Sequence, residues 1–119
     1  MRRIVLVVED DADIRAALAA FLEDAGFTVA VASNGSEGLK ELARIERPCL
    51  ILLDWWMPVL SGREFLEVLK AHPEKSALPV VVMTTGEPPP LPGIVAFLRK
   101  PFGLSRLLNL LEAFCPSSS

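Results

Sequence analysis

Residues 49–54 read CLILLD, a continuous apolar run that ends in a single acid, Asp54. Such a run predicts a strand that is buried on both faces, as the strands of a parallel sheet are. In open α/β sheets, ligands bind in the crevice beyond the carboxyl ends of the strands. We therefore expect Asp54 to be presented to a ligand.

Three further apolar runs also end in polar side chains. They are 4–8 (IVLVV) before Glu9 and Asp10, 80–83 (VVVM) before Thr84, and 94–98 (IVAFL) before Arg99 and Lys100. If the four strands are parallel, their carboxyl ends meet at one edge of the sheet. Acids, a hydroxyl and a base would then surround one crevice.

Helical patterns separate these runs. We expect helices over about 12–25, 36–45, 61–71 and 104–114, and a further strand over 27–32. Asp11 is a suitable N-cap for the first helix, and Gly26 is a suitable residue to end it. The alternation of strand and helix predicts an α/β fold, a doubly wound parallel sheet with helices on both faces.

The connection 85–93 breaks the alternation, since it holds four prolines in nine residues, which excludes an ordinary helix. A helix of this length would span about 14 Å at roughly 1.5 Å per residue. A polyproline II segment would span about 28 Å at roughly 3.1 Å per residue. Because the crossover must return the length of a strand, about 17 Å, and also step sideways, we expect a Pro-rich extended segment to shorten or replace the fourth helix.

The composition is that of one domain. We assign 1–115 to a domain with a hydrophobic core and 116–119 to a disordered tail. A net charge of −3 provides no electrostatic footprint for nucleic acid, and the apolar runs are too short to span a membrane. We expect a cytoplasmic protein in which Cys49 and Cys115 are reduced thiols rather than a disulfide framework.

The expected crevice has the chemistry of phosphoryl transfer. Glu9, Asp10 and Asp54 would lie close together, and two like charges 4 Å apart repel by about 4 kcal/mol at an effective dielectric near 20. The cluster therefore needs a cation or a shared proton, and its hard oxygen ligands suit Mg²⁺. With Lys100 as a fixed positive charge and Thr84 as a hydroxyl donor, the group matches phosphoryl transfer to a carboxylate.

Several residues also have plainer interpretations. Asp11 and Asp13 are expected only to cap and decorate the first turn of a helix, and Asp10 could do the same. Lys100 could be a surface lysine before a turn proline. His72, the one histidine of the chain, lies after a predicted helix and away from the crevice, so the phosphoryl donor must come from elsewhere.

The motifs resemble those of the response-regulator receiver domain of two-component signalling. The matching segments are 6–11 (LVVEDD), 53–58 (LDWWMP) with Ser61-Gly62, 79–85 (PVVVMTT) and 97–102 (FLRKPF). They extend over nearly the whole chain in the family's order. The resemblance implies a flavodoxin-like fold, a five-stranded parallel sheet of order 2-1-3-4-5.

The resemblance also implies roles in the crevice. Asp54 would be the phosphoacceptor, taking a phosphoryl group from a histidine kinase or a phosphotransfer protein. Asp10 and Asp54 would bind Mg²⁺ with the backbone carbonyl of Trp56, and Glu9 would act largely through water. Such a domain is not an enzyme, beyond catalysing its own phosphorylation and dephosphorylation, and it signals through partner binding or phosphorelay.

Further residues match the family's switch. Lys100 would contact the phosphoryl oxygens. Thr84 would swing its hydroxyl to the phosphate, and Phe97, at the switch aromatic position, would move inward with it. The Lys100–Pro101 bond resembles the family's cis peptide, an isomer that occurs essentially only before proline.

Three departures from the family pattern matter. Loss of the fourth helix would alter the output face and leave apolar surface uncovered, from which we predict a homodimer. Trp55 and Trp56 follow the phosphoacceptor, where smaller side chains are common; they are either hydrophobic cover, or Trp56 shields the acyl phosphate from water, as we hypothesise. Gly103 takes a place where the family often has an acidic cap.

Two other functions are considered. A receiver-fold interaction or dimerisation module that phosphorylation does not switch would fit the altered face. An aspartyl phosphatase of the haloacid dehalogenase type would carry a second Asp two residues after the nucleophile, where this chain has Trp56. The acidic residues, Thr84 and Lys100 favour the phosphoacceptor.

Overall fold

Strands and helices alternate along the chain as the apolar runs predict. The computed structural model describes residues 3–57, 59–86, 91 and 93–116. The elements in order are β1 (Ile4–Val8), α1 (Ala12–Asp24), β2 (Thr28–Ala32), α2 (Gly35–Arg44), β3 (Leu50–Asp54), α3 (Gly62–Ala71), β4 (Val80–Thr84), β5 (Ile94–Arg99) and α4 (Leu104–Phe114).

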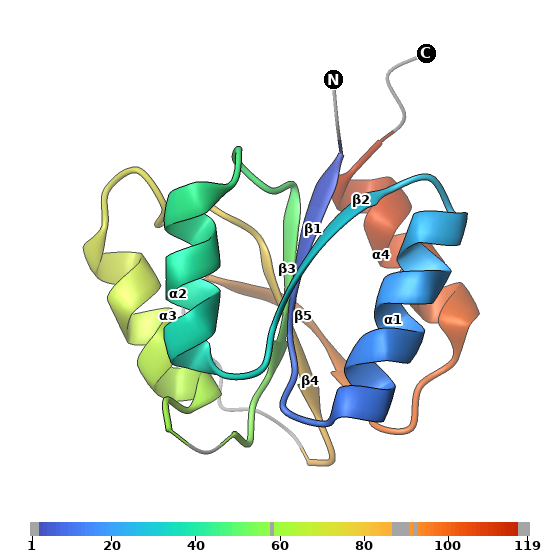
Figure 1. Cartoon of the computed structure of the whole chain (residues 1–119), viewed down its shortest axis with the longest axis horizontal. Helices are drawn as coiled ribbons and strands as arrows, with labels where there is room; N and C mark the ends of the chain where they lie inside the picture. Colours follow the sequence, from blue (N-terminus) through green and yellow to red (C-terminus); the bar gives the residue numbers. More distant parts are fainter. Residues whose placement is uncertain (1–2, 58, 87–90, 92, 117–119) are drawn as a thin grey trace.

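The five strands form one parallel sheet in the order β2-β1-β3-β4-β5, which confirms the expected flavodoxin-like order 2-1-3-4-5. Every residue of β1, β3 and β4 is buried, because helices cover both faces of the sheet. Figure 1 shows α2 and α3 on one face and α1 and α4 on the other. Two hydrophobic clusters fill these two interfaces and together form the core.

Side chains cap the first three helices. Asp11 accepts hydrogen bonds from the amides of Asp13 and Ile14, as expected for an N-cap. Asn34 caps α2, and Ser61 forms a reciprocal capping box at α3. The last helix differs, because Gly103 at its N-cap provides no side-chain hydrogen bond.

The connection from β4 to β5 has no helix among its described residues, 85, 86, 91 and 93. The described chain therefore has four helices where the doubly wound pattern would place five, consistent with the shortened fourth helix. Residues 87–90 and 92 lie outside the described residues, and so does the expected extended conformation of that segment. The same holds for residues 117–119 of the expected tail.

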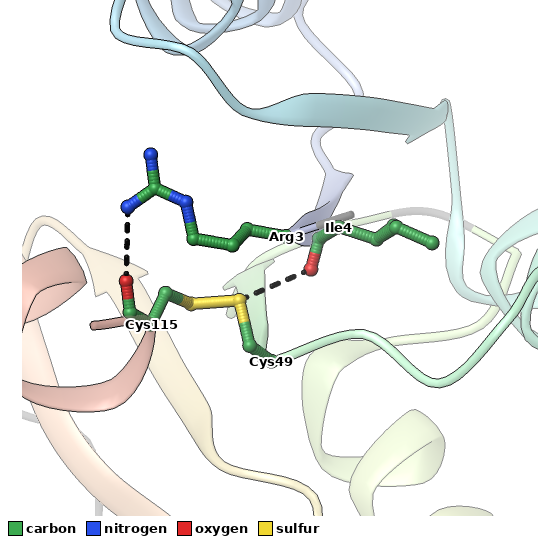
Figure 2. The surroundings of a disulfide bond; sticks show 4 residues. All are labelled: Arg3, Ile4, Cys49 and Cys115. Atoms are coloured by element: carbon green, nitrogen blue, oxygen red, sulfur yellow. Dashed lines mark hydrogen bonds between the residues drawn. A yellow bond between two sulfur atoms is a disulfide. The ribbon is translucent and has the colours of Figure 1, made fainter. Parts of the chain in front are cut away.

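The two cysteines are bonded to each other, so the prediction of two reduced thiols is wrong. Cys49 and Cys115 lie 66 residues apart in the sequence, but their Cα atoms are 5.4 Å apart. Cys49 immediately precedes β3, and Cys115 is the C-cap residue that follows α4. Figure 2 shows the bond beside Arg3 and Ile4, at the amino-terminal edge of the sheet. Only the packing of α4 against the sheet brings these positions together, which the cysteine spacing does not reveal.

No helix in the described part of the chain has both the length and the apolar character needed to cross a membrane.

Candidate functional site

Three carboxylates meet where neighbouring strands end. Glu9 and Asp10 follow β1, and Asp54 is the last residue of β3, which pairs directly with β1. One oxygen from each carboxylate lies within 4.8 Å of the others. Glu9 is fully buried and Asp54 is 4% exposed, whereas Asp10 is open to solvent. The predicted acidic cluster is therefore present, with two of its residues buried and Asp10 at the surface.

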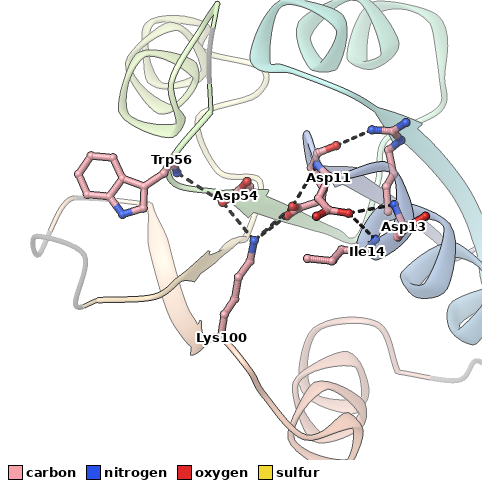
Figure 3. A network of polar contacts seen from close by, with 8 residues as sticks. Asp11, Asp13, Ile14, Asp54, Trp56 and Lys100 are labelled. Carbon is pink, nitrogen blue, oxygen red and sulfur yellow. Dashed lines mark hydrogen bonds and ion pairs between the residues drawn. The ribbon is translucent and has the colours of Figure 1, made fainter.

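Lys100 places its ammonium group in this cluster. Its Nζ lies 3.1 and 3.2 Å from the two carboxylate oxygens of Glu9 and 3.5 Å from Oδ1 of Asp54. Figure 3 shows the side chain reaching across the crevice to Asp54. The Lys100 amide donates to the Thr84 carbonyl at 2.7 Å, which fixes the lysine backbone to the end of β4. The peptide bond to Pro101 is cis, as expected.

The two predicted switch residues lie on the adjacent strands. Thr84 ends β4, is 1% exposed, and its hydroxyl accepts a hydrogen bond from the Gly86 amide at 3.2 Å. Phe97 on β5 is half-buried and pairs with Val82, two positions before Thr84. Phe97 therefore lies closer to the amino-terminal ends of the strands than Thr84 does, and outside the carboxylate cluster. Its carbonyl accepts from Arg106 of α4 at 3.2 Å.

The two tryptophans have different surroundings. Trp55 is 5% exposed and packs in the core behind the pocket, whereas Trp56 is 69% exposed. The Trp56 amide donates to Oδ1 of Asp54 at 3.4 Å, but Figure 3 shows its indole pointing away from that carboxylate. Of the two interpretations, hydrophobic cover therefore applies to Trp55, whose side chain is part of the core. Shielding of Asp54 by Trp56 would require the indole to rotate from this conformation.

Of the residues given plainer interpretations, Asp11, Asp13 and His72 lie outside the carboxylate cluster, whereas Asp10 belongs to it and Lys100 contacts it. Asp11 caps α1, and the exposed Asp13 belongs to its first turn. His72 is exposed at the end of α3. The structure thus brings together Glu9, Asp10 and Asp54 with the ammonium of Lys100.

The electrostatics of the pocket act on its central carboxylate. Burial, a hydrogen bond shared with Asp10 and the charge of Glu9 raise the pKa of Asp54 to about 7, although Lys100 opposes them. Burial alone would lower the pKa of Lys100, but the hydrogen bond to Glu9 and the charge of Asp54 outweigh it and raise that pKa. Without a further cation, Asp54 therefore holds a proton far more readily than an ordinary aspartate.

This shift makes the metal-free protein lose stability as the pH rises. The pKa of Asp54 is about 7 in the folded chain, whereas in the unfolded chain it returns to 3.8, the ordinary value for an aspartate. Between pH 3.8 and about pH 7, the folded chain therefore binds a proton on Asp54 that the unfolded chain has lost. We expect the free energy of unfolding to fall by about 2–3 kcal/mol from pH 5 to 7 and then to level off. Urea unfolding in EDTA measures this slope. If Asp54→Asn shows the same dependence of unfolding free energy on pH as the wild type, a group other than Asp54 causes that dependence.

Two residues support the pocket from behind, in roles that the sequence interpretation did not assign to them. Gly62, at the start of α3, lies so close to Trp55 and the Asp54 carbonyl that a Cβ atom would meet them at 2.8–2.9 Å. Arg15 of α1 donates to the Glu9 carbonyl at 2.8 Å and so ties the helix to the acidic turn. The position of Gly62 directly after a serine cap is a weak sequence signal for its close packing. The contact of Arg15 with the Glu9 carbonyl has no signal in the sequence.

The protein resembles a large family over nearly its whole length. The family model of the response regulator receiver domain matches residues 5–112. The chain belongs to this family. The members of the family act as phosphoacceptors and signal transducers rather than as classical enzymes, and they bind Mg²⁺ in the acidic pocket.

Individual relatives agree with the assignment. This receiver domain is 35% identical to the nitrogen assimilation regulatory protein NtrX of Azorhizobium caulinodans, over 94% of this chain but only 26% of that protein. The chemotaxis protein CheY4 of Vibrio cholerae is 30% identical, with a TM-score of 0.87 over 96% of this chain and 99% of that one. The receiver domain of the sensor histidine kinase PA1611 of Pseudomonas aeruginosa, 24% identical, shares the fold with a TM-score of 0.87 over 98% of this chain and 100% of that one. Its structure holds a magnesium ion in the active-site cleft.

Proposed function

We propose that this receiver domain takes a phosphoryl group onto Asp54 from a histidine kinase or a phosphotransfer protein. The observation that carries the proposal is the position of the Asp54 carboxylate, almost buried between two further acids and an ammonium group. A nucleophilic carboxylate, a site for a divalent cation and a fixed positive charge are the parts that phosphoryl transfer needs. The proposed compartment is the cytoplasm.

In the proposed reaction, a carboxylate oxygen of Asp54 attacks the phosphorus of a phosphohistidine. The P–N bond to the donor breaks as the P–O bond forms, and the departing imidazole takes up a proton. Lys100, already 3.5 Å from Asp54, would contact the transferred phosphoryl oxygens, and the Thr84 hydroxyl would donate to them. In the later hydrolysis, water attacks the phosphorus, the P–O bond to Asp54 breaks, and inorganic phosphate leaves as the carboxylate is restored, so acceptance and loss of the phosphoryl group both use the domain's own residues.

The carboxylates fit a magnesium ion. Asp10 and Asp54 would hold it directly with the backbone carbonyl of Trp56, and Glu9 would act largely through water. The close approach of the three acids, within 4.8 Å, is what an oxygen-preferring cation requires. When bound, the ion would neutralise the charge that builds up on the acyl phosphate and favour the ionised form of Asp54.

We further propose that phosphorylation is read through Thr84 and Phe97. The Thr84 hydroxyl now accepts from the Gly86 amide, so turning it to a phosphate would break that hydrogen bond. Movement of Phe97 would disturb the Arg106 hydrogen bond to its carbonyl and thereby α4. Signalling would follow by partner binding or by passing the phosphoryl group on.

A homodimer through the β4–β5 side is part of this proposal. Val95 is 44% exposed and Phe97 is only half-buried, which leaves apolar surface beside a connection without a described helix. We expect light scattering to detect dimers at high protein concentration, and a strictly monomeric protein would contradict the prediction.

Acetyl phosphate provides the test of phosphoryl acceptance. Treated with acetyl phosphate and Mg²⁺, the protein should gain the mass of one phosphoryl group, and with EDTA it should gain none. An unchanged mass in both samples would instead support a receiver-fold module that phosphorylation does not switch.

Arg15 should matter for metal binding although it does not contact the carboxylate groups. We expect Arg15→Ala to weaken Mg²⁺ binding about 10-fold, as loss of an outer-shell contact does, because the Glu9 carbonyl is released. Tryptophan fluorescence, with two indoles next to Asp54 in the chain, can follow the titration. Arg47→Ala is the matched control, since Arg47 donates to the Glu74 carbonyl away from the pocket. Equal Mg²⁺ affinities in the two variants would contradict this role.

A further inference from the structure

The Cys49–Cys115 bond lies at the opposite edge of the sheet from the phosphoacceptor. Cys49 immediately precedes β3 and Asp54 ends it. At roughly 3.3 Å per residue, the strand separates them by about 16 Å. Chemistry at the two sulfurs can therefore change the attachment of α4 without touching the carboxylates.

The helix that carries Cys115 depends on this attachment more than the others do. α4 has no side-chain N-cap, no acid in its first turn and no base in its last turn. The other three helices all have side-chain caps and an acid in the first turn. Leu107 and Leu111 are buried, and Phe114 of the last turn packs against the same core cluster; the disulfide adds a covalent hold to these apolar contacts at the end of α4.

The surroundings of the bond favour attack at one sulfur. Cys49 is half-buried, whereas Cys115 is 2% exposed, so an attacking thiolate reaches Cys49 first. Cys115 is then the leaving group. The Arg3 guanidinium donates to the Cys115 carbonyl at 3.2 Å, and Figure 2 shows it beside this residue. A nearby positive charge favours a departing thiolate.

The structure also accommodates the reduced state. Sγ of Cys49 lies 3.4 Å from the Ile4 carbonyl oxygen. A disulfide sulfur carries no proton, so in the oxidised chain this contact is not a hydrogen bond. Once reduced, the Cys49 thiol has a proton and an acceptor already in place. Cys49 can therefore be a disulfide sulfur or a hydrogen-bonded thiol in the same position, without a rearrangement of β1 or β3.

We propose that Cys49–Cys115 is a reversible redox modification site that takes a dithiol as its reactant and controls how firmly the end of α4 is held. The dithiol's first thiolate attacks Cys49 and expels the Cys115 thiolate. Its second thiol then releases Cys49 and closes a disulfide in the reductant. Two electrons and two protons pass to the protein, which ends with two thiols. In the proposed cytoplasmic compartment, disulfides are usually of this transient or sensing kind.

Hydrogen exchange on the full chain, oxidised with glutathione disulfide or reduced with dithiothreitol, tests the proposal. Alkylation and mass analysis should find no free thiols in the first sample and two in the second. On reduction, we expect amides in the last turn of α4 to exchange about 10-fold faster relative to those of α1. The melting temperature should fall on the order of 10 °C, because a long loop is opened.

Cys115→Ser and Cys49→Ser should each exchange as the reduced chain does and ignore dithiothreitol. Two results would overturn the proposal. One is two free thiols after oxidation. The other is equal acceleration of α1 and α4 on reduction, which would mean that the bond constrains only the unfolded chain. Neither readout uses phosphorylation, so the outcome is independent of the function proposed for Asp54.

Discussion

Asp54→Asn will gain no phosphoryl group from acetyl phosphate and Mg²⁺ under conditions that fully phosphorylate the wild type. An amide has the shape of the carboxylate but lacks its nucleophilic oxygen, so the fold should persist while acceptance stops. Removing the carboxylate whose pKa is raised to about 7 should also stabilise the metal-free protein near neutral pH. Intact-mass analysis measures acceptance, and urea unfolding confirms that the variant is folded.

Asp13→Asn is the matched control for this prediction. Asp13 is an exposed acid in the first turn of α1, close in sequence to the pocket but outside the carboxylate cluster. We expect it to accept phosphate at the wild-type rate. If Asp54→Asn gained phosphate as fast as this control, the acceptor would be another residue.

Lys100→Met will have a large effect on both stability and phosphorylation. Glu9 is fully buried and would keep the Asp11 amide, at 3.3 Å, but would lose the ammonium that contacts both of its oxygens. Breaking a fully buried pair costs about 3–5 kcal/mol. Because Lys100 is 20% exposed, we expect a loss of about 2–4 kcal/mol in EDTA at neutral pH. The rate of phosphorylation should fall about 100-fold, as for removal of an electrostatic stabiliser of a transition state.

Magnesium separates this explanation from simple damage to the fold. The ion would neutralise the same carboxylates, so Mg²⁺ should raise the melting temperature of Lys100→Met more than that of the wild type. Lys40→Met is the control, since Lys40 is exposed on α2 and its loss should change neither property. A Lys100→Met protein as stable as this control in EDTA would show that the Glu9 contact contributes nothing.

The elements of the fold were largely predictable because their signals are local. The apolar runs predict β1, β3 and β4 to within a residue at each end, since strands buried on both faces must be apolar throughout. Asp11 predicts the start of α1 because a carboxylate can satisfy free amides of the first turn. The prolines in 85–93 predict the interruption of the pattern, because proline cannot donate a helical hydrogen bond.

The carboxylate cluster was predictable for a different reason. Parallel strands align their carboxyl ends, so residues that follow separate apolar runs must approach one another once the strands pair. Glu9, Asp10 and Asp54 meet in this way, with Lys100 beside them. The direction of the Trp56 indole was not predictable, because an exposed side chain is oriented by its local backbone and neighbours rather than by burial.

By itself, the sequence determined the order of strands and helices, the parallel arrangement of the sheet and the acids at its edge, because burial and hydrogen bonding impose these patterns on short segments. Only the tertiary structure decided which distant atoms touch. It placed Arg15 against the Glu9 carbonyl, set the distance from Lys100 to Glu9, and joined Cys49 to Cys115. These contacts depend on how helices dock against the two faces of the sheet, and a docking distance of a few ångströms is the sum of many side-chain contacts that no single segment encodes.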